Sequence, residues 1–205
     1  MVAATEMEIG SFIETNHSAD ILITGVGVPV STYHLLKRIY QIDYDLVIQA
    51  GIAGSFDLAH PPGTTVLVSK DIFADVAIEE NNQLYSLKEM GLANPELAFS
   101  TGWLENHNEL LQKIPLKKVA GITVNKVSDN TFQSQQYLKK YTPDIQSMEG
   151  AVLHYVCLNE AVPFIQLRTI SNFVGERDKS KWKLKEALQN LNENLRSIIS
   201  ELQKL

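Results

Sequence analysis

Cysteine is almost absent from this chain of 205 residues, in which Cys157 is the only one. One thiol cannot build a disulfide framework or a zinc site with several cysteine ligands, so both classes of small scaffold are excluded. Proteins of oxidising compartments commonly carry paired cysteines. We therefore expect a soluble protein of a reducing compartment, the cytoplasm.

Positive charge is also scarce: 18 Lys and Arg face 24 Asp and Glu, which gives a formal net charge of -6. Nucleic acids and anionic membranes are recognised through basic surfaces, so we expect neither partner. No apolar run approaches the roughly 18 residues that a membrane-spanning helix needs. The start of the chain carries Glu6 and Glu8, where a signal peptide has lysines and an apolar core.

Hydrophobic residues make up 44% of the sequence, an ordinary fraction for a globular protein. The length suits one compact domain, since domains usually contain about 100–200 residues. No internal repeat, low-complexity tract or long linker divides the sequence. We therefore expect a single domain over residues 1–205.

Short apolar runs rich in β-branched residues alternate with stretches of helical periodicity. This alternation predicts an α/β domain with a largely parallel central sheet. The stretch 74–114 breaks the pattern with Asn, Gly and Pro residues and suggests an irregular excursion with one or two short helices, placed as a lid over a site. The predicted strands are 1–4, 21–24, 45–49, 65–69, 122–127 and 164–170, and the predicted helices are 30–41, 149–160 and 182–205.

Two glycine-bearing segments follow predicted strands. Residues 24–29 (TGVGVP) lack the third glycine of a dinucleotide fingerprint and are explained by a tight strand-to-helix turn. Residues 49–55 (QAGIAGS) place small side chains, among them Ala53 and Gly54, at the edge where open α/β sheets bind ligands.

Three polar residues stand at other strand-to-helix junctions: Glu8, Glu149 and Asn172. Each alone is explained by helix capping or by the helix dipole. Because carboxyl ends of parallel strands meet in one crevice, the three side chains are expected to converge there. Two carboxylates and an amide can bind a sugar, activate a water and hold a heterocycle. They do not suggest a metal site, and we expect no metal or organic cofactor.

Five segments occur in the order and approximate spacing of a known family. They resemble the nucleoside phosphorylase and methylthioadenosine nucleosidase family of purine N-glycosidic enzymes over about residues 2–200. The resemblance implies a three-layer α/β/α fold with a mixed, largely parallel sheet, a small-molecule purine nucleoside as substrate, and a homo-oligomer. The segments are 4–9 (ATEMEI), 24–27 (TGVG), 50–54 (AGIAG), 147–150 (SMEG) and 168–172 (RTISN).

The resemblance also implies roles for single residues. Glu8 matches the acid that activates the attacking water, Glu149 the carboxylate that accepts hydrogen bonds from the ribose hydroxyls, and Met148 packs beneath the sugar. Asn172 stands where adenine-specific members have an aspartate and enzymes for 6-oxopurines often have an asparagine. The segment 127–132 can be aligned with the loop that stacks a phenylalanine on the purine, here Phe132, although Asp129 and Asn130 depart from the family motif.

Residues 171–178 and Trp182 are most similar to the branch of this family that hydrolyses futalosine and releases hypoxanthine, a step of menaquinone biosynthesis. Futalosine carries a carboxylate, and Arg177 or Lys179 could pair with it. A solvated helix start explains this basic run equally well.

Water is the expected nucleophile rather than phosphate. The family's phosphorylases have an arginine and a serine at the positions of Gln49 and Ile52. An isoleucine would leave a phosphate poorly solvated.

Three alternatives stay open: a methylthioadenosine/adenosylhomocysteine-type nucleosidase, an inosine-type phosphorylase, and a nucleoside-binding protein without catalysis. Glu8 argues against the last, since mere binding does not need it. His154 and Cys157 are expected to be packing residues. The other histidines show no metal-ligand spacing: His17, His34, His60 and His107.

Overall fold

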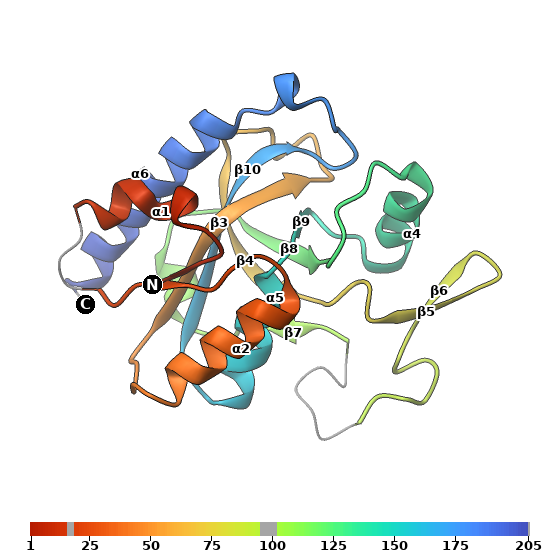
Figure 1. The fold of residues 1–205 in the computed structure, drawn as a ribbon, viewed down its shortest axis with the longest axis horizontal. Helices are drawn as coiled ribbons and strands as arrows, with labels where there is room; N and C mark the ends of the chain where they lie inside the picture. The colour runs from red at the N-terminus through yellow and green to blue at the C-terminus, as the bar shows by residue number, and fades with distance from the viewer. Residues whose placement is uncertain (16–18, 95–101, 205) are drawn as a thin grey trace.

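The computed structural model describes residues 1–15, 19–94 and 102–204. Within these ranges the chain has the predicted mixed α/β architecture, an eight-stranded mixed sheet with helices on both faces (Figure 1). None of the described helices is both long and apolar enough to cross a bilayer. In chain order the elements are β1 (Val2–Ala3), α1 (Glu6–Ile13), β2 (Leu22–Ile23), α2 (Val28–Ile39), β3 (Val47–Ser55), β4 (Thr65–Asp71), β5 (Ala77–Glu80), β6 (Gln83–Ser86), β7 (Leu104–Glu105), α3 (Leu110–Lys113), β8 (Lys118–Thr123), α4 (Thr131–Tyr141), β9 (Ile145–Ser147), α5 (Gly150–Asn159), β10 (Phe164–Phe173) and α6 (Leu184–Leu202).

The sheet closes on itself through its two longest strands. β3 pairs in parallel with β10 along nearly its whole length, and the order β10–β4–β8–β9–β3 completes a ring. β1 and β2 extend from β3 as parallel strands. Each strand of the ring contributes to one small apolar cluster, which fills it: Ala53, Val66, Val68, Val119, Ile145 and Ile170.

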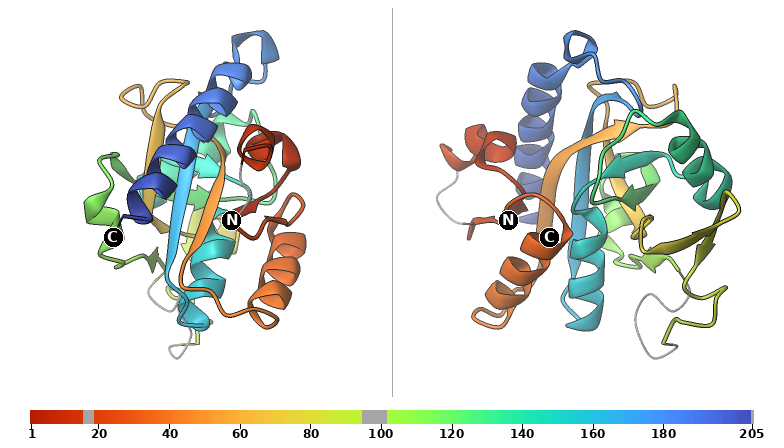
Figure 2. Two further views of the ribbon diagram at one scale, coloured as in Figure 1. Left: turned by 90° about the vertical axis from the view of Figure 1, so that its left-hand side faces the viewer. Right: turned by 45° about the vertical axis from the view of Figure 1, so that its right-hand side comes forward.

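Two pairs of helices cover the sheet. α1 and α6 share one apolar core with the sheet, and α2 and α5 share a second (Figure 2). The predicted C-terminal amphipathic helix is confirmed as α6, which buries Leu191, Leu195 and Ile198. From α6, buried Asn192 donates a hydrogen bond to the Glu8 carbonyl and accepts one from the Phe12 amide, both at 2.8 Å. The last helix therefore holds the short first helix in place.

The structure corrects several element predictions. The strand predicted at 122–127 is instead β8, Lys118–Thr123, because the chain leaves the sheet after Thr123, where polar Asn125 and Lys126 interrupt the apolar run. Helix α4 was not predicted, and α1 and the three-residue strand β9 were implied only by the junctions at Glu8 and Glu149, without bounds. Within 74–114 the described residues include the predicted short helix, α3, but also the β5–β6 hairpin and β7, which were not predicted.

A layer of buried polar side chains supports the N-terminus of α5. Asp71, at the end of β4, is fully buried and accepts hydrogen bonds from the Thr123 hydroxyl at 3.0 Å and from the Gln166 amide at 3.3 Å. The Thr123 oxygen accepts one from the Ala151 amide in the first turn of α5 at 2.7 Å. These bonds tie α5 to β4, β8 and β10.

Burial raises the pKa of the Asp71 carboxyl to about 6, although its hydrogen bonds and the nearby Arg168 act in the opposite direction. The folded protein therefore binds this proton more tightly than the unfolded chain does. The contribution of Asp71 to stability is largest below about pH 4 and declines as the pH rises to about 6, by roughly 3 kcal/mol in all.

We predict that Asp71→Asn removes this pH dependence, because the amide oxygen still accepts from Thr123 and Ile72 while the charge is gone. Relative to wild type, the free energy of unfolding of the variant should rise by about 3 kcal/mol between pH 4 and pH 7.5. Urea unfolding across this range measures it, with exposed Asp43→Asn as the control for loss of one carboxylate. If the free energy of unfolding changed with pH in the same way in wild type and in Asp71→Asn, the prediction would be wrong.

Candidate active site

A cavity of about 380 Å³ opens where the parallel strands β1, β3 and β10 end. This is the edge at which the sequence places the polar junction residues. Apolar side chains, among them Ile52, Val127 and Val174, form much of its wall. Such a mixture of apolar walls and a few polar groups is typical of small-molecule sites.

Glu8 enters the cavity from the first turn of α1, and its side chain is 5% exposed. Its Oε2 accepts hydrogen bonds from the Thr5 amide at 2.9 Å and the Thr5 hydroxyl at 3.1 Å. Its Oε1 accepts one from the Ile52 amide at 3.1 Å. A carboxylate can accept about four hydrogen bonds, and these three leave one acceptor position free. Glu8 can therefore cap α1 and still bind a water, so the capping and catalytic interpretations are compatible.

Glu149 lines the same cavity from the N-cap of α5. Its Oε1 accepts a hydrogen bond from the Gly27 amide at 2.8 Å. Gly27 has φ 96°, a conformation that favours glycine, so the 24–29 segment is the expected tight turn and also orients a site carboxylate. Burial raises the pKa of Glu149, Glu8 adds to this effect, and Arg168 and the Gly27 amide oppose it.

Arg168 is the residue that the sequence interpretation missed. Its side chain is 1% exposed, and its Nη2 donates to Gln49 Oε1 at 2.6 Å. Gln49 Nε2 in turn donates to the Glu149 backbone carbonyl at 3.2 Å. A Cβ on Gly51 would collide with the Arg168 guanidinium and lie 2.8 Å from Glu8 Oε1, so only glycine lets the two approach. The Arg168 guanidinium therefore lies close to the carboxylates of Glu8 and Glu149.

Asn172 reaches the cavity because of an irregularity in β10. The register between β10 and β3 shifts between Ile170 and Asn172, and both Ser171 and Asn172 line the cavity. Asn172 Oδ1 accepts from the Ser171 hydroxyl at 2.7 Å, and Nδ2 donates to the Phe173 carbonyl at 2.8 Å. One amide N–H is thus left for a ligand, since an amide nitrogen has two.

Arg177 and Trp182 form part of the outer wall. The Arg177 guanidinium carbon lies 5.7 Å from the centre of the Trp182 ring, within the range of a cation–π contact. The Trp182 indole donates to the Glu176 carbonyl at 3.0 Å. Lys179, the other candidate cation, is exposed and does not line the cavity.

The structure brings together all but two of the candidate site residues predicted from the sequence; the exceptions are Lys179 and Phe132. Phe132 does not line the cavity; it lies in the first turn of α4 and is 45% exposed. The expected lid is not found either, since the described residues of 74–114 contribute nothing to the wall. The residues that do line the cavity are Glu8, Ala53, Gly54, Met148, Glu149, Asn172 and Arg177.

The packing residues are where the sequence predicts them. His154 and Cys157 are buried in α5, and burial lowers the pKa of His154 to about 4 and raises that of Cys157 to about 12. His17 lies outside the described residues. Some described residues of 74–114 instead border a second, apolar cavity of about 270 Å³, together with Phe73, Tyr141 and Tyr155.

The arrangement can perform one kind of chemistry well. A carboxylate with a free acceptor position can take a proton from a bound water, and a second carboxylate can accept hydrogen bonds from sugar hydroxyls. The amide of Asn172 can bind a polar heterocycle. The apolar wall between them would exclude bulk water from the reacting bond.

Comparison with known proteins identifies the family of this chain. The model of the Phosphorylase superfamily matches residues 4–204. A futalosine hydrolase of Thermus thermophilus is 28% identical over 188 residues, covering 88% of this chain and 80% of its own. A futalosine hydrolase of Acidothermus cellulolyticus is also 28% identical, over 177 residues that cover 85% of this chain and 72% of its own.

Solved structures share the fold. The native structure of futalosine hydrolase from Helicobacter pylori superimposes with a TM-score of 0.80 at 19% identity, covering 98% of this chain and 96% of that one. The 5′-methylthioadenosine/S-adenosylhomocysteine nucleosidase of Colwellia psychrerythraea, in complex with adenine, gives 0.80 at 18% identity, covering 98% and 93%.

Proposed function

The chain belongs to the phosphorylase superfamily, and within it we propose that it is a purine nucleosidase that hydrolyses the N-glycosidic bond of futalosine. The products are hypoxanthine and dehypoxanthine futalosine, as in menaquinone biosynthesis. The relatives named as futalosine hydrolases align with most of the chain and support this substrate.

The cavity suits an N-glycosidic hydrolysis. Cleavage of the C1′–N9 bond passes through an oxocarbenium-like state, as in glycoside hydrolysis. A water held by Glu8 attacks C1′ and gives its proton to that carboxylate, while Glu149 accepts hydrogen bonds from the ribose hydroxyls. Met148, on the cavity wall, packs beneath the sugar.

Asn172 favours hypoxanthine as the leaving group. Negative charge moves onto the purine as the bond breaks, and in hypoxanthine the ring carries a carbonyl that can share it. The free N–H of Asn172 can donate to N7 or O6 and stabilise this charge. An amide cannot protonate adenine at N7 as an aspartic acid can, so the 6-aminopurine nucleosides of the methylthioadenosine type fit less well.

The charges of the cavity wall favour water over phosphate as the nucleophile, and this observation carries the assignment as a hydrolase. Among the described residues that line the cavity, Glu8, Glu149 and Glu176 are acidic and Arg177 alone is basic. Gln49 is bound within the protein by Arg168 and the Glu149 carbonyl, and Ile52 presents an apolar surface. A phosphate dianion would meet repulsion and poor solvation there.

Arg177 is the proposed partner of the carboxylate on futalosine. It is exposed, borders the same cavity and contacts Trp182, which limits where its guanidinium can lie. Charge-assisted hydrogen bonds between arginine and a carboxylate are among the stronger ones.

Location and assembly are part of the same proposal. We propose a cytoplasmic enzyme, consistent with the single buried cysteine, Cys157. We also propose that the chain self-associates. The second cavity is strongly apolar, and Val76 on its wall is 45% exposed. Exposed apolar surface of this kind is typical of a face that another subunit covers.

Product analysis by chromatography tests the activity. We predict that futalosine yields hypoxanthine at the same rate with and without phosphate, and that methylthioadenosine yields little adenine. Adenine as the main product would instead favour the nucleosidase alternative, and phosphate-dependent release from inosine the phosphorylase. Tight binding of nucleosides without any turnover would indicate a binding protein.

The role of Arg177 is tested by Arg177→Ala. Loss of the charge pair should raise KM for futalosine about tenfold, which corresponds to roughly 1.4 kcal/mol, and leave KM for inosine unchanged. Lys179→Ala is the matched control, since it removes a charge from the same run but not from the cavity wall. Equal changes in KM for the two substrates would rule out the charge pair.

A further inference from the structure

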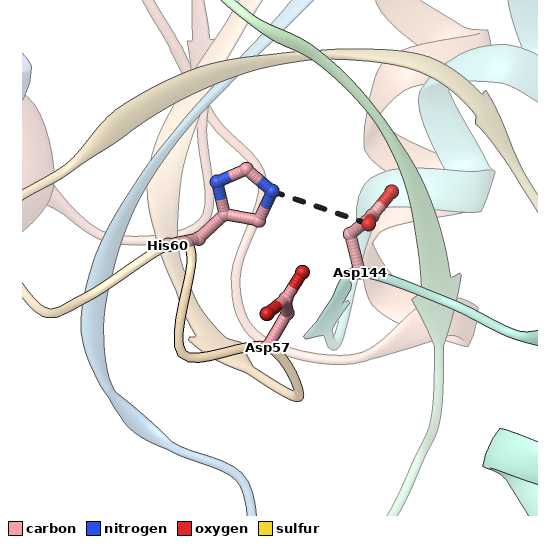
Figure 3. A group of neighbouring side chains, drawn as sticks. All are labelled: Asp57, His60 and Asp144. Atoms are coloured by element: carbon pink, nitrogen blue, oxygen red, sulfur yellow. Dashed lines mark ion pairs between the residues drawn. The ribbon is translucent and has the colours of Figure 1, made fainter.

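Three side chains with metal-ligand chemistry gather outside the active site: Asp57, His60 and Asp144 (Figure 3). Asp57 and His60 lie in the loop that follows β3, and Asp144 immediately precedes β9. One ligand atom from each lies within 4.8 Å of the other two. The spacing in the sequence does not reveal this group, because the third member comes from a distant segment.

His60 is the unusual member. Its side chain is 1% exposed, and within the described structure its Nε2 is buried without a hydrogen-bond partner. Nε2 points toward Asp144 Oδ1 at a distance of 4.0 Å, which is too long for a hydrogen bond (Figure 3). Buried polar atoms nearly always have a hydrogen-bond or ligand partner. A bound metal ion would be the missing partner of this nitrogen.

The two carboxylates are already oriented by the backbone. Asp144 Oδ2 accepts a hydrogen bond from the Ala120 amide at 2.7 Å, and Asp57 Oδ1 accepts one from the Ala59 amide at 2.8 Å. Asp144 Oδ1 and Asp57 Oδ2 are then available to an ion. Hydrogen bonds of this kind to ligating carboxylates are the usual outer support of a metal site.

We propose that Asp57, His60 and Asp144 bind a divalent transition-metal ion, with Zn²⁺ as the best match. Two carboxylates and a neutral imidazole carry two negative charges, which a dication neutralises. A nitrogen ligand disfavours Mg²⁺ and Ca²⁺, which prefer oxygen, whereas zinc accepts imidazole and carboxylate together.

The dimensions also fit zinc. Ligand atoms about 2.0–2.1 Å from a tetrahedral zinc lie about 3.4 Å from one another. Nε2 and Asp144 Oδ1 therefore need to approach by roughly 0.6 Å, and the other ligand atoms, all within 4.8 Å of one another, by at most roughly 1.4 Å. Asp57 is exposed, so a water can complete the fourth position.

The proposed ion is structural rather than catalytic. β3 and β9 pair through Ser55 and Ile145 and through Gly54 and Gln146, and the second pair lines the active-site cavity. Asp57, His60 and Asp144 do not line it. The ion would join the loop after β3 to the start of β9 and so fix the cavity wall from outside.

Calorimetric titration of chelator-treated, untagged protein with ZnCl₂ tests the site. We expect one Zn²⁺ per chain in wild type, with affinity reduced about 100-fold in Asp57→Asn and in Asp144→Asn. Asp57→Asn changes an exposed side chain, so it is expected to fold normally, and circular dichroism verifies this. His107→Ala is the matched control, because His107 pairs with Glu105 at 3.7 Å on the surface, outside the cluster.

Two further readouts keep the test independent of enzyme activity. Zn²⁺ should raise the Tm of wild type and of His107→Ala but not of the two aspartate variants. Co²⁺ in the same site should give visible absorption bands typical of tetrahedral coordination, and Asp57→Asn should lose them. No saturable binding tighter than about 100 µM in wild type, or unchanged affinity in either aspartate variant, would overturn the proposal.

Discussion

The buried guanidinium of Arg168 is the interaction on which the rest of the site depends. Glu8 and Glu149 are each only 5% exposed, and two buried carboxylates in one cavity repel each other and lose hydration. Arg168 lies against Gly51 directly behind them and opposes the rise in the pKa of Glu149. Loss of one partner from such a buried set commonly costs about 3–5 kcal/mol, so the cation and the glycine that admits it are requirements of the fold as well as of the chemistry.

The fold brings these groups together from both ends of the chain. The parallel strands β1, β3 and β10 end at the same cavity, and closure of the sheet through β3 and β10 places Asn172 beside Gly54. α1 has only eight residues and would be marginal alone; Asn192 of α6 holds it through hydrogen bonds to Glu8 and Phe12. The position of Glu8 is therefore determined by the last helix, more than 180 residues along the chain.

Much of this could be predicted from the sequence, and the exceptions have physical reasons. Buried strands such as β4 and β10 are recognisable as short apolar runs, and the long helix α6 has clear helical periodicity. The meeting of parallel strand ends at one edge of a sheet predicts that Glu8, Glu149 and Asn172 lie together. Arg168 gives no such signal, because a lone arginine within an apolar strand does not reveal what it faces. β9 has only three residues and is too short to show a pattern. The assignment of Phe132 as the residue that stacks on the purine depended on an alignment that Asp129 and Asn130 already weaken, and the side chain is exposed. His60 and Asp144 meet only through tertiary structure.

In the proposed mechanism Glu8 is the base that activates water and is not needed for affinity. Glu8→Gln measures this most directly, because the glutamine oxygen can still accept from the Thr5 amide in the capping box, although the bond from the Ile52 amide is lost, and the neutral amide cannot take a proton from water. The decisive measurement is kcat on futalosine beside the Kd of the same variant for the substrate. We predict a fall in kcat of about 1000-fold, within the usual range for loss of a general base, with Kd nearly unchanged. Turnover close to that of wild type would contradict it.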